Sequence, residues 1–325
     1  MVARTVSPQS LPAPTGGMHR AQRPTGVAMA LVIVFGAFLL QSVVTMIIVV
    51  VQVFASGIPT DFHADDLLAM TRSRLGLTLS LLSFGVALGV IWLWVRAKEK
   101  RPFASLGFEQ RLGAGGKILR GLGVGLIMML VCVLVPLLTG QATLTWSAPG
   151  ASALLVIAIM LFAFLLQGST EEIMTRGFLT QAVARRFGLA IAIGVQALVF
   201  TLTHGANPGM GPMPIVNLLL FAVFASFYSL ADGSLWGICA MHGIWNWAQG
   251  NLFGVAVSGQ QTTDSFFAYT INADSSSLLT GGVFGIEGSL VTTIVYLLGI
   301  ALAFRAFRRR SGVAAVSNTA GSPVA

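Results

Sequence analysis

The chain has 325 residues, of which 55% are hydrophobic and only 9% are charged, and its formal net charge is +8. A soluble globular domain carries about 25% charged residues, so this composition excludes a soluble enzyme and predicts a polytopic membrane protein. Apolar runs recur along the whole chain, which also excludes a soluble domain that follows a single signal peptide.

The apolar runs predict an all-α fold with about eight transmembrane helices. Residues 1–26 come first; they contain Ser, Pro, Gly and Gln without periodicity and are expected to form a disordered cytoplasmic tail. A Gly/Ser/Thr-rich segment before the last span is expected as an outer loop, and residues 311–325 as a second disordered tail. The spans are expected near 27–54, 77–95, 119–139, 152–183, 188–205, 213–231, 233–251 and 288–307.

Basic residues gather in four parts of the chain, which alternate with regions almost free of Lys and Arg. They are the N-terminal tail, the segment 96–120, the turn with Arg185 and Arg186, and the C-terminal end from Arg305 to Arg310. This is the positive-inside pattern, and an even number of spans puts all four parts in the cytoplasm. We therefore expect a multi-pass protein of the cell membrane with both termini cytoplasmic. Its positive charge is expected to contact anionic lipid at the cytoplasmic face, and not a nucleic acid.

Strongly polar side chains are few in the predicted spans, and they gather in the fourth to the seventh. An ionised side chain near the centre of a bilayer costs about 3 kcal/mol, so a chain that keeps several is expected to use them. Polar groups in lipid must find each other or water. These spans are therefore expected to enclose one polar cavity, formed by Glu171, Glu172, Arg176, His204, Asn217, Asp232, His242 and Asn246.

Helical spacing indicates which of these groups can meet. Glu172 and Arg176 are four residues apart, share one face and can form an ion pair. Glu171 points about 100° around the helix from Glu172, so it remains available to the cavity. His242 and Asn246 also share a face. The acidic and basic groups could instead form a structural cluster that holds helices together, but two carboxylates exceed what one arginine needs for neutralisation.

The same residue types suit hydrolysis by an activated water molecule. A carboxylate in an apolar pocket is a stronger base, an imidazole can hold or carry the water's proton, and a second imidazole with a carboxamide can stabilise an oxyanion. No Gly-x-Ser-x-Gly or His-Glu-x-x-His motif occurs, and the two cysteines have no partner at a recognisable spacing. Water activated by Glu and His therefore fits the sequence better than a covalent nucleophile.

Three motifs follow each other in the predicted spans: Glu171-Glu172-Ile-Met-Thr-Arg176, Phe200-Thr-Leu-Thr-His204 and His242-Gly-Ile-Trp-Asn246. In this order they resemble the EExxxR, FxxxH and HxxxN/D motifs of the CPBP family of intramembrane proteases, also called the CAAX-protease or Abi family. The resemblance implies an intramembrane endopeptidase, a hydrolase, with its catalytic core over 151–251. The N-terminal helices over 27–150 would precede this core, and the outer loop and last helix over 252–310 would follow it.

The resemblance also implies roles for the motif residues. Glu171 with His204 would activate the water, and His242 with Asn246 would stabilise the oxyanion. The substrate would be a peptide or protein within or at the membrane. A metal-free site is favoured, although a zinc ion held by Glu171, His204 and His242 stays open. The residues that would support the site are Glu172, Arg176 and Phe200.

Two other functions stay open. A non-catalytic membrane protein, such as an immunity or scaffold protein, would keep the same fold without cleaving peptides. A transporter with an intramembrane acidic site would couple uptake or proton movement to Glu171. The histidines give little support to a transporter, and the internal repeat of many transporters is not evident in the sequence.

Overall fold

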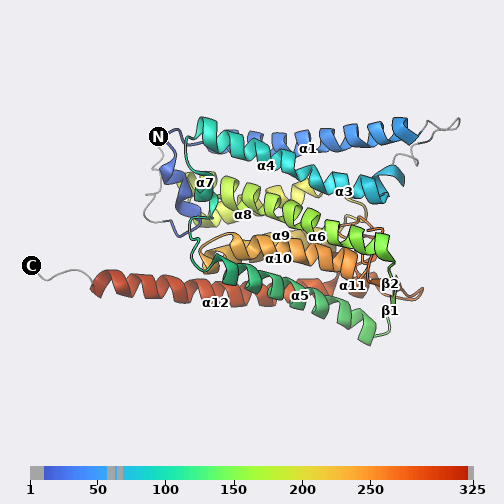
Figure 1. Cartoon of the computed structure of the whole chain (residues 1–325). Helices are drawn as coiled ribbons and strands as arrows, with labels where there is room; N and C mark the ends of the chain where they lie inside the picture. The colour runs from blue at the N-terminus through green and yellow to red at the C-terminus, as the bar shows by residue number, and fades with distance from the viewer. Residues whose placement is uncertain (1–10, 57–62, 64–68, 321–325) are drawn as a thin grey trace, which may run out of the picture.

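The computed structural model describes residues 11–56, 63 and 69–320, which form a bundle of helices lying roughly side by side (Figure 1). Helices occupy all eight places where the sequence predicts a span. The prediction of an all-α, polytopic membrane protein is therefore confirmed. In the described residues, six helical stretches are long and apolar enough to cross a membrane: Val27–Ala55, Arg74–Lys98, Ala114–Leu138, Ala151–Phe187, Pro212–Asp232 and Leu290–Ser311.

The helices of the bundle follow the predicted order. Their bounds are α1 Val27–Ser56, α3 Arg74–Leu82, α4 Phe84–Leu93, α5 Ala114–Leu138, α6 Ala151–Glu172, α7 Thr180–Phe187, α8 Leu189–Thr203, α9 Pro212–Asp232, α10 Trp236–Trp247 and α12 Leu290–Ala320. Short π-helical segments extend α4, join α6 to α7 and extend α10, over Trp94–Lys98, Ile173–Leu179 and Ala248–Leu252. Outside these six stretches, α8 with 15 residues and α10 with 12 occupy predicted spans but are shorter than the roughly 20 residues of an ordinary span.

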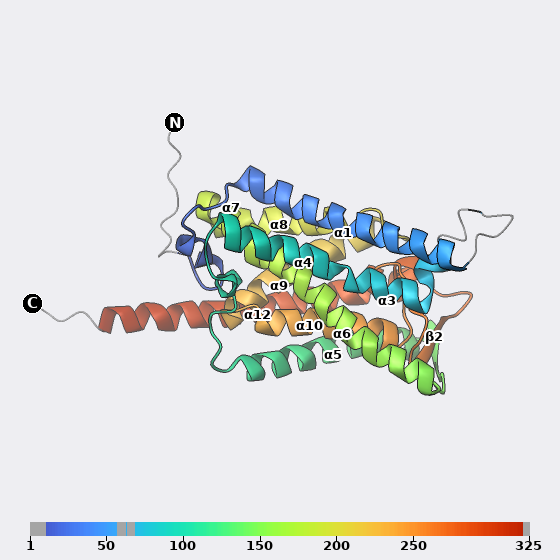
Figure 2. The same ribbon diagram turned by 45° about the horizontal axis from the view of Figure 1, so that its top comes forward.

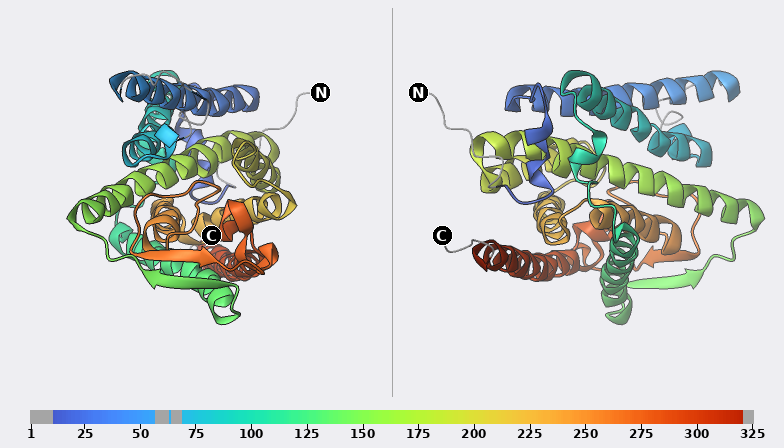
Figure 3. Two further views of the ribbon diagram at one scale, coloured as in Figure 1. Left: turned by 90° about the vertical axis from the view of Figure 1, so that its right-hand side faces the viewer. Right: turned by 60° about the vertical axis from the view of Figure 1, so that its left-hand side comes forward.

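The helix α10 lies in the core of the bundle. It packs against α5 and α6, while α9 packs against α8 and α12. The helices α1, α3 and α4 form a layer on one side (Figure 3), and α6 crosses diagonally between that layer and α5 (Figure 2). Every residue of α10 from Gly237 to Asn246 is buried. The third motif of the sequence therefore lies inside the protein and not on its lipid-facing surface.

The two ends of the bundle differ in character. The helix α1 begins and α12 ends at the same end, where the basic parts of the sequence also lie (Figure 1); we call it the basic end. The opposite end holds the short helix α11, Ser277–Thr280, and two strands, β1 Ala142–Trp146 and β2 Phe267–Ile271. The strands pair antiparallel, with Leu144 opposite Tyr269. The Gly/Ser/Thr-rich segment expected as an outer loop is thus partly ordered, because its strand β2 pairs with β1.

The segment before α1 is ordered, so the prediction of a disordered tail over 1–26 is wrong from residue 11 onward; the earlier residues lie outside the described part. Met18 is buried in the bundle. Gln181 of α7 donates a hydrogen bond from Nε2 to the carbonyl oxygen of Pro14, at 2.8 Å. The composition of the segment does not reveal this order, because a buried polar side chain of a distant helix holds it.

The helix α12 continues to Ala320, so the predicted start of a disordered tail at residue 311 is also wrong. The apolar part of this helix ends at Ser311. A helix can leave the bilayer without ending, because its backbone hydrogen bonds are internal to the segment. Residues 321–325 lie outside the described residues.

One basic residue of the segment 96–120 faces the protein interior and not the lipid. Arg101 is 1% exposed, and it donates from Nε to Glu99 Oε2 and from Nη1 to Gln181 Oε1, both at 2.6 Å. Burial lowers the pKa of Arg101, and the charge of Glu99 opposes that shift. The expectation of lipid contact for this segment therefore does not extend to Arg101.

Candidate active site

Glu171 and Glu172 lie at the end of α6, where the helix passes into the π-helical segment Ile173–Leu179. A short π-helical insertion within an α-helix is often found at functional sites. The two glutamates are almost fully buried, with 2% and 0% exposed. Because a buried carboxylate is costly unless it is paired or hydrogen-bonded, each glutamate needs partners within the protein.

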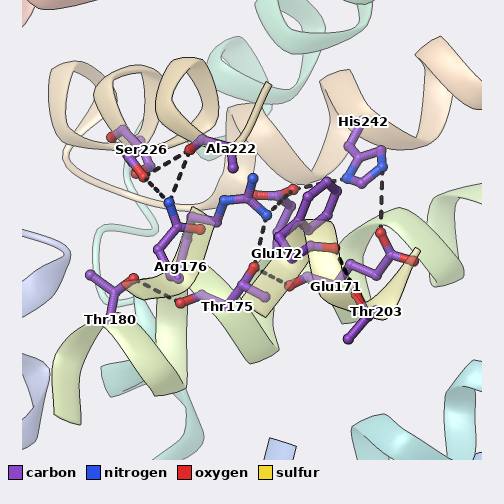
Figure 4. Close-up of polar contacts among 12 residues, drawn as sticks. Glu171, Glu172, Thr175, Arg176, Thr180, Thr203, Ala222, Ser226 and His242 are labelled. Carbon is purple, nitrogen blue, oxygen red and sulfur yellow. Dashed lines mark hydrogen bonds and ion pairs between the residues drawn. The ribbon is translucent and has the colours of Figure 1, made fainter. Parts of the chain in front are cut away.

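Glu172 forms an ion pair with Arg176, as the four-residue spacing predicts. The distance from Arg176 Nη1 to Glu172 Oε1 is 3.2 Å (Figure 4). The guanidinium also lies over the ring of Phe200, with 4.5 Å between Cζ and the ring centroid, which is a cation–π contact. Both partners of the ion pair are buried. The first two motifs are therefore joined through the arginine.

His242 lies between the two carboxylates. Its Nδ1 atom donates to Glu172 Oε1 at 2.8 Å (Figure 4); because a carboxylate accepts, Nδ1 carries the proton. Its Nε2 atom lies 3.7 Å from Glu171 Oε2. The contact joins the third motif to the first, although 70 residues separate them in the chain. In the neutral imidazole, Nε2 then presents a lone pair toward Glu171.

Glu171 keeps one carboxylate oxygen outside any hydrogen bond in the described residues. Its Oε1 atom accepts a hydrogen bond from Gln167 Nε2 at 2.6 Å. Its Oε2 atom is buried and has no hydrogen-bond partner among those residues. The side chain lines the cavity described below, as its angular offset from Glu172 predicts.

His204 follows the last residue of α8 and faces the same cavity. Its Nδ1 atom donates to the carbonyl oxygen of Phe200 at 2.8 Å, so Nε2 presents the lone pair. The rings of His204 and Phe200 are 4.7 Å apart, and the ring of Phe200 lies 6.2 Å from that of His242. Phe200 therefore contacts residues of all three motifs.

A glutamine that sequence reasoning did not assign to the site connects two of its members. Gln167 donates to Glu171, as described above, and its Oε1 atom accepts a hydrogen bond from Asn246 Nδ2 at 2.8 Å. Gln167 precedes Glu171 by four residues and so shares its helix face. This spacing is the signal that could have identified it.

A cavity of about 700 Å³ brings the four predicted catalytic residues together. Its size lies within the usual range of small-molecule sites, about 300–1,000 Å³. The predicted polar cavity is therefore present. Its lining includes Glu171, His204, His242 and Asn246.

Of the residues expected in the cavity, Glu172 and Arg176 are not among those that line it, and Asn217 and Asp232 have other main contacts. Asn217 lines it but donates from Nδ2 to the carbonyl oxygens of Glu287 and Ser289, at 2.7 and 2.8 Å. Asp232 lies at the basic end of α9, where it forms an ion pair with Arg120. Asp232 is not among the residues that line the cavity.

The residues suggested as zinc ligands do not form a three-ligand site. In the described part of the chain, no group of three or more His, Cys, Asp or Glu side chains could hold a metal ion. Glu171 and His242 lie near each other, but a structural or catalytic zinc needs at least three protein ligands.

Two glycines allow α6 and α10 to approach beside the site. A Cβ atom on Gly243 would lie 2.7 Å from the Cα atom of Leu165, and one on Gly168 would lie 2.8 Å from the backbone nitrogen of Gly243. Small residues commonly let helix backbones approach each other in membranes. Because these glycines neighbour His242 and Gln167, the contact sets how far apart α6 and α10 lie at the cavity.

We expect Gly243→Ala to lower the free energy of unfolding by about 1–3 kcal/mol, because the added methyl group meets backbone that cannot move aside. Thermal unfolding in detergent measures the effect. Gly194→Ala in α8 is the matched control, since a Cβ atom there has no heavy atom within 4 Å. Equal stability of the two variants would contradict the importance of the close approach.

Comparison with known proteins adds to this geometry. Residues 153–248 match the family model described as type II CAAX prenyl endopeptidase Rce1-like. The match covers just under a third of the chain and includes all three motifs. No match was found among curated proteins or among solved structures. The match supports the resemblance to the CAAX-protease family over residues 153–248.

Proposed function

We propose that the protein is an intramembrane endopeptidase that hydrolyses peptide bonds with water activated by Glu171 and His204. The observation that carries this proposal is the buried Oε2 atom of Glu171, in the side chain that lines the cavity. It has no hydrogen-bond partner in the described residues. A carboxylate oxygen so placed can accept a proton from water. The family match supports a peptide bond as the target.

In the first step, a water molecule donates hydrogen bonds to Glu171 Oε2 and His204 Nε2, and its oxygen adds to the carbonyl carbon of the peptide. The lone pair of His204 Nε2 is available because Nδ1 donates to Phe200. Glu171 takes one proton from the water and passes it to His242 Nε2, which lies 3.7 Å from its Oε2 atom. The imidazolium that forms has Glu172 as its counter-charge, at 2.8 Å from Nδ1.

In the second step, donors near Glu171 stabilise the oxyanion of the tetrahedral intermediate. They are the protonated Nε2 of His242 and one hydrogen of Asn246 Nδ2, whose other hydrogen is bonded to Gln167. When the C–N bond breaks, the proton moves from His242 to the amine nitrogen. The products are a carboxylic acid and an amine, and each side chain regains its starting protonation state.

We also propose that the substrate is a peptide or protein within or at the membrane. The basic end lies in the cytoplasm of the cell, where its arginines and lysines contact anionic lipid headgroups. Both termini of the chain lie on that side. A match to type II CAAX prenyl endopeptidases supports a membrane substrate but does not extend to a prenylated one.

A non-catalytic immunity or scaffold protein is the alternative. The contacts among Glu172, Arg176, Phe200 and His242 hold α6, α8 and α10 together, and they would do so without catalysis. Such a protein would bind a peptide partner and release it uncut. The purified protein in liposomes, incubated with a peptide library and assayed by mass spectrometry, separates the two functions. New peptide termini support the endopeptidase, and their absence across the library supports the scaffold.

The same assay tests for a metal. We expect cleavage to continue in EDTA or o-phenanthroline at concentrations that remove zinc, because Glu171 and His204 activate the water directly. As a control for inhibition by the chelator itself, cleavage is measured again after the chelator has been removed by dialysis. Loss of cleavage in the chelator, with recovery on addition of zinc, would contradict the metal-free site.

A further inference from the structure

The cavity that holds the candidate active site is lined by segments from one end of the bundle. Connections between helices at the end opposite the basic end contribute Arg72, Asn207, Ser258, Gln260 and Thr262. The described lining residues include none from the connections at the basic end, which lie near 99–113, 188 and 233–235. The direction in which the cavity extends is therefore defined: it reaches from the catalytic residues toward the opposite end.

The basic end is closed beneath the site by buried side chains. Arg176 and Gln181, which follow the glutamates along the same helix, are 1% and 0% exposed. Gln181 is bonded to the carbonyl oxygens of Pro14 and Ser105 and to the guanidinium of Arg101. The N-terminal segment and the connection before α5 thus cover this end of α7. A peptide arriving from the basic end would have to displace this network.

The side of the cavity between α1 and α8 is apolar and faces lipid. Phe35 and Leu39 of α1 and Leu202 of α8 line the cavity, and each is also exposed on the surface of the bundle. Toward the opposite end, the lining becomes polar and includes the exposed side chains of Arg72 and Gln260. One side thus suits an apolar segment in lipid, and the other suits hydrated peptide.

We infer that the substrate reaches this site from the outer side of the membrane, as a membrane-anchored peptide whose cleaved segment enters at the end opposite the basic end. The inference rests on the proposed function for the cutting step, and on the positive-inside pattern for the orientation. The anchor lies in lipid beside α1 and α8, and the extended segment passes Gln260 to reach Glu171. A cytoplasmic tail entering from the basic end would have to displace the contacts of Gln181 with Pro14 and Ser105.

Cysteine accessibility tests the direction of entry without any need for activity. The variants are Thr203→Cys in the cavity, Gln260→Cys at its outer mouth and Arg111→Cys at the basic end; the native Cys132 and Cys239 are buried. Intact cells are treated with a small membrane-impermeant thiol reagent, before and after permeabilisation. We expect Thr203→Cys and Gln260→Cys to react in intact cells and Arg111→Cys to react only after permeabilisation. Reaction of Thr203→Cys only after permeabilisation, or of Arg111→Cys in intact cells, overturns the inference.

A cleavage experiment then distinguishes failure of this inference from failure of the proposed function. Liposomes with the protein in a known orientation receive a cleavable peptide on one side only. We expect cleavage when the peptide is on the side of Gln260, and none when it is on the side of Arg111. Cleavage only from the side of Arg111 overturns the direction of entry but keeps the endopeptidase. If Thr203→Cys reacts in intact cells but the peptide is cleaved from neither side, the proposed endopeptidase activity is wrong, while the outward-facing cavity stands.

Discussion

Glu171→Gln is expected to lower kcat for peptide hydrolysis about 10²- to 10⁴-fold, the range that a general base contributes. The substitution preserves the shape of the side chain, and its amide oxygen can still accept the hydrogen bond from Gln167 that Oε1 accepts now. It removes the oxygen that takes the proton from water. Cleavage of a peptide by the purified variant, compared with the wild-type protein at equal concentration, measures the loss.

The control for this result is Glu109→Gln, because Glu109 is partly exposed and pairs with Arg20 far from the cavity. Its cleavage rate should equal that of the wild-type protein. Both variants should unfold at the wild-type Tm, which separates loss of chemistry from loss of fold. Retained cleavage by Glu171→Gln would contradict the role of Glu171 as the base.

Glu172→Gln is expected to lower the free energy of unfolding by about 3–5 kcal/mol, because it removes the ion-pair partner of the buried guanidinium of Arg176. Thermal unfolding in detergent measures this effect. We expect peptide cleavage to fall as well, since Glu172 is also the counter-charge of the His242 imidazolium. The two glutamates are thus expected to differ: Glu171 supports the reaction, and Glu172 supports both the fold and the reaction.

The double variant Glu172→Gln/Arg176→Met provides the sharper comparison. Removing both charges of a buried pair is often neutral, whereas removing one is costly. The double variant should therefore regain most of the stability that the single variant loses, while its cleavage activity stays low. A double variant less stable than Glu172→Gln would indicate that the contact of Arg176 with Phe200 matters more than its charge.

Sequence reasoning predicted the fold well because its main signals are local. Apolar runs of span length predict transmembrane helices at any position in the chain. Composition, which predicted a disordered tail, failed for residues 11–26, whose order depends on Gln181 in a distant helix. It also ended α12 too early, because hydropathy reports the membrane boundary and not the end of the helix.

Within the site, spacing predicted contacts along one helix but not between helices. The pairing of Glu172 with Arg176 and the separate direction of Glu171 follow from helical geometry. The position of His242 between the two glutamates does not, because it depends on how α10 packs on α6. The close approach that permits it rests on Gly168 and Gly243, and a single glycine in an apolar helix carries no such signal by itself.

The shortness of α8 has a consequence for the membrane itself. Its 15 residues extend only about 22 Å along the helix axis, against about 30 Å for the hydrocarbon core of a typical bilayer. Local thinning of the surrounding lipid is one way in which a bilayer matches a short hydrophobic element. Thinning next to His204 would bring bulk water closer to the cavity. Acyl-chain length would then influence how readily water reaches Glu171.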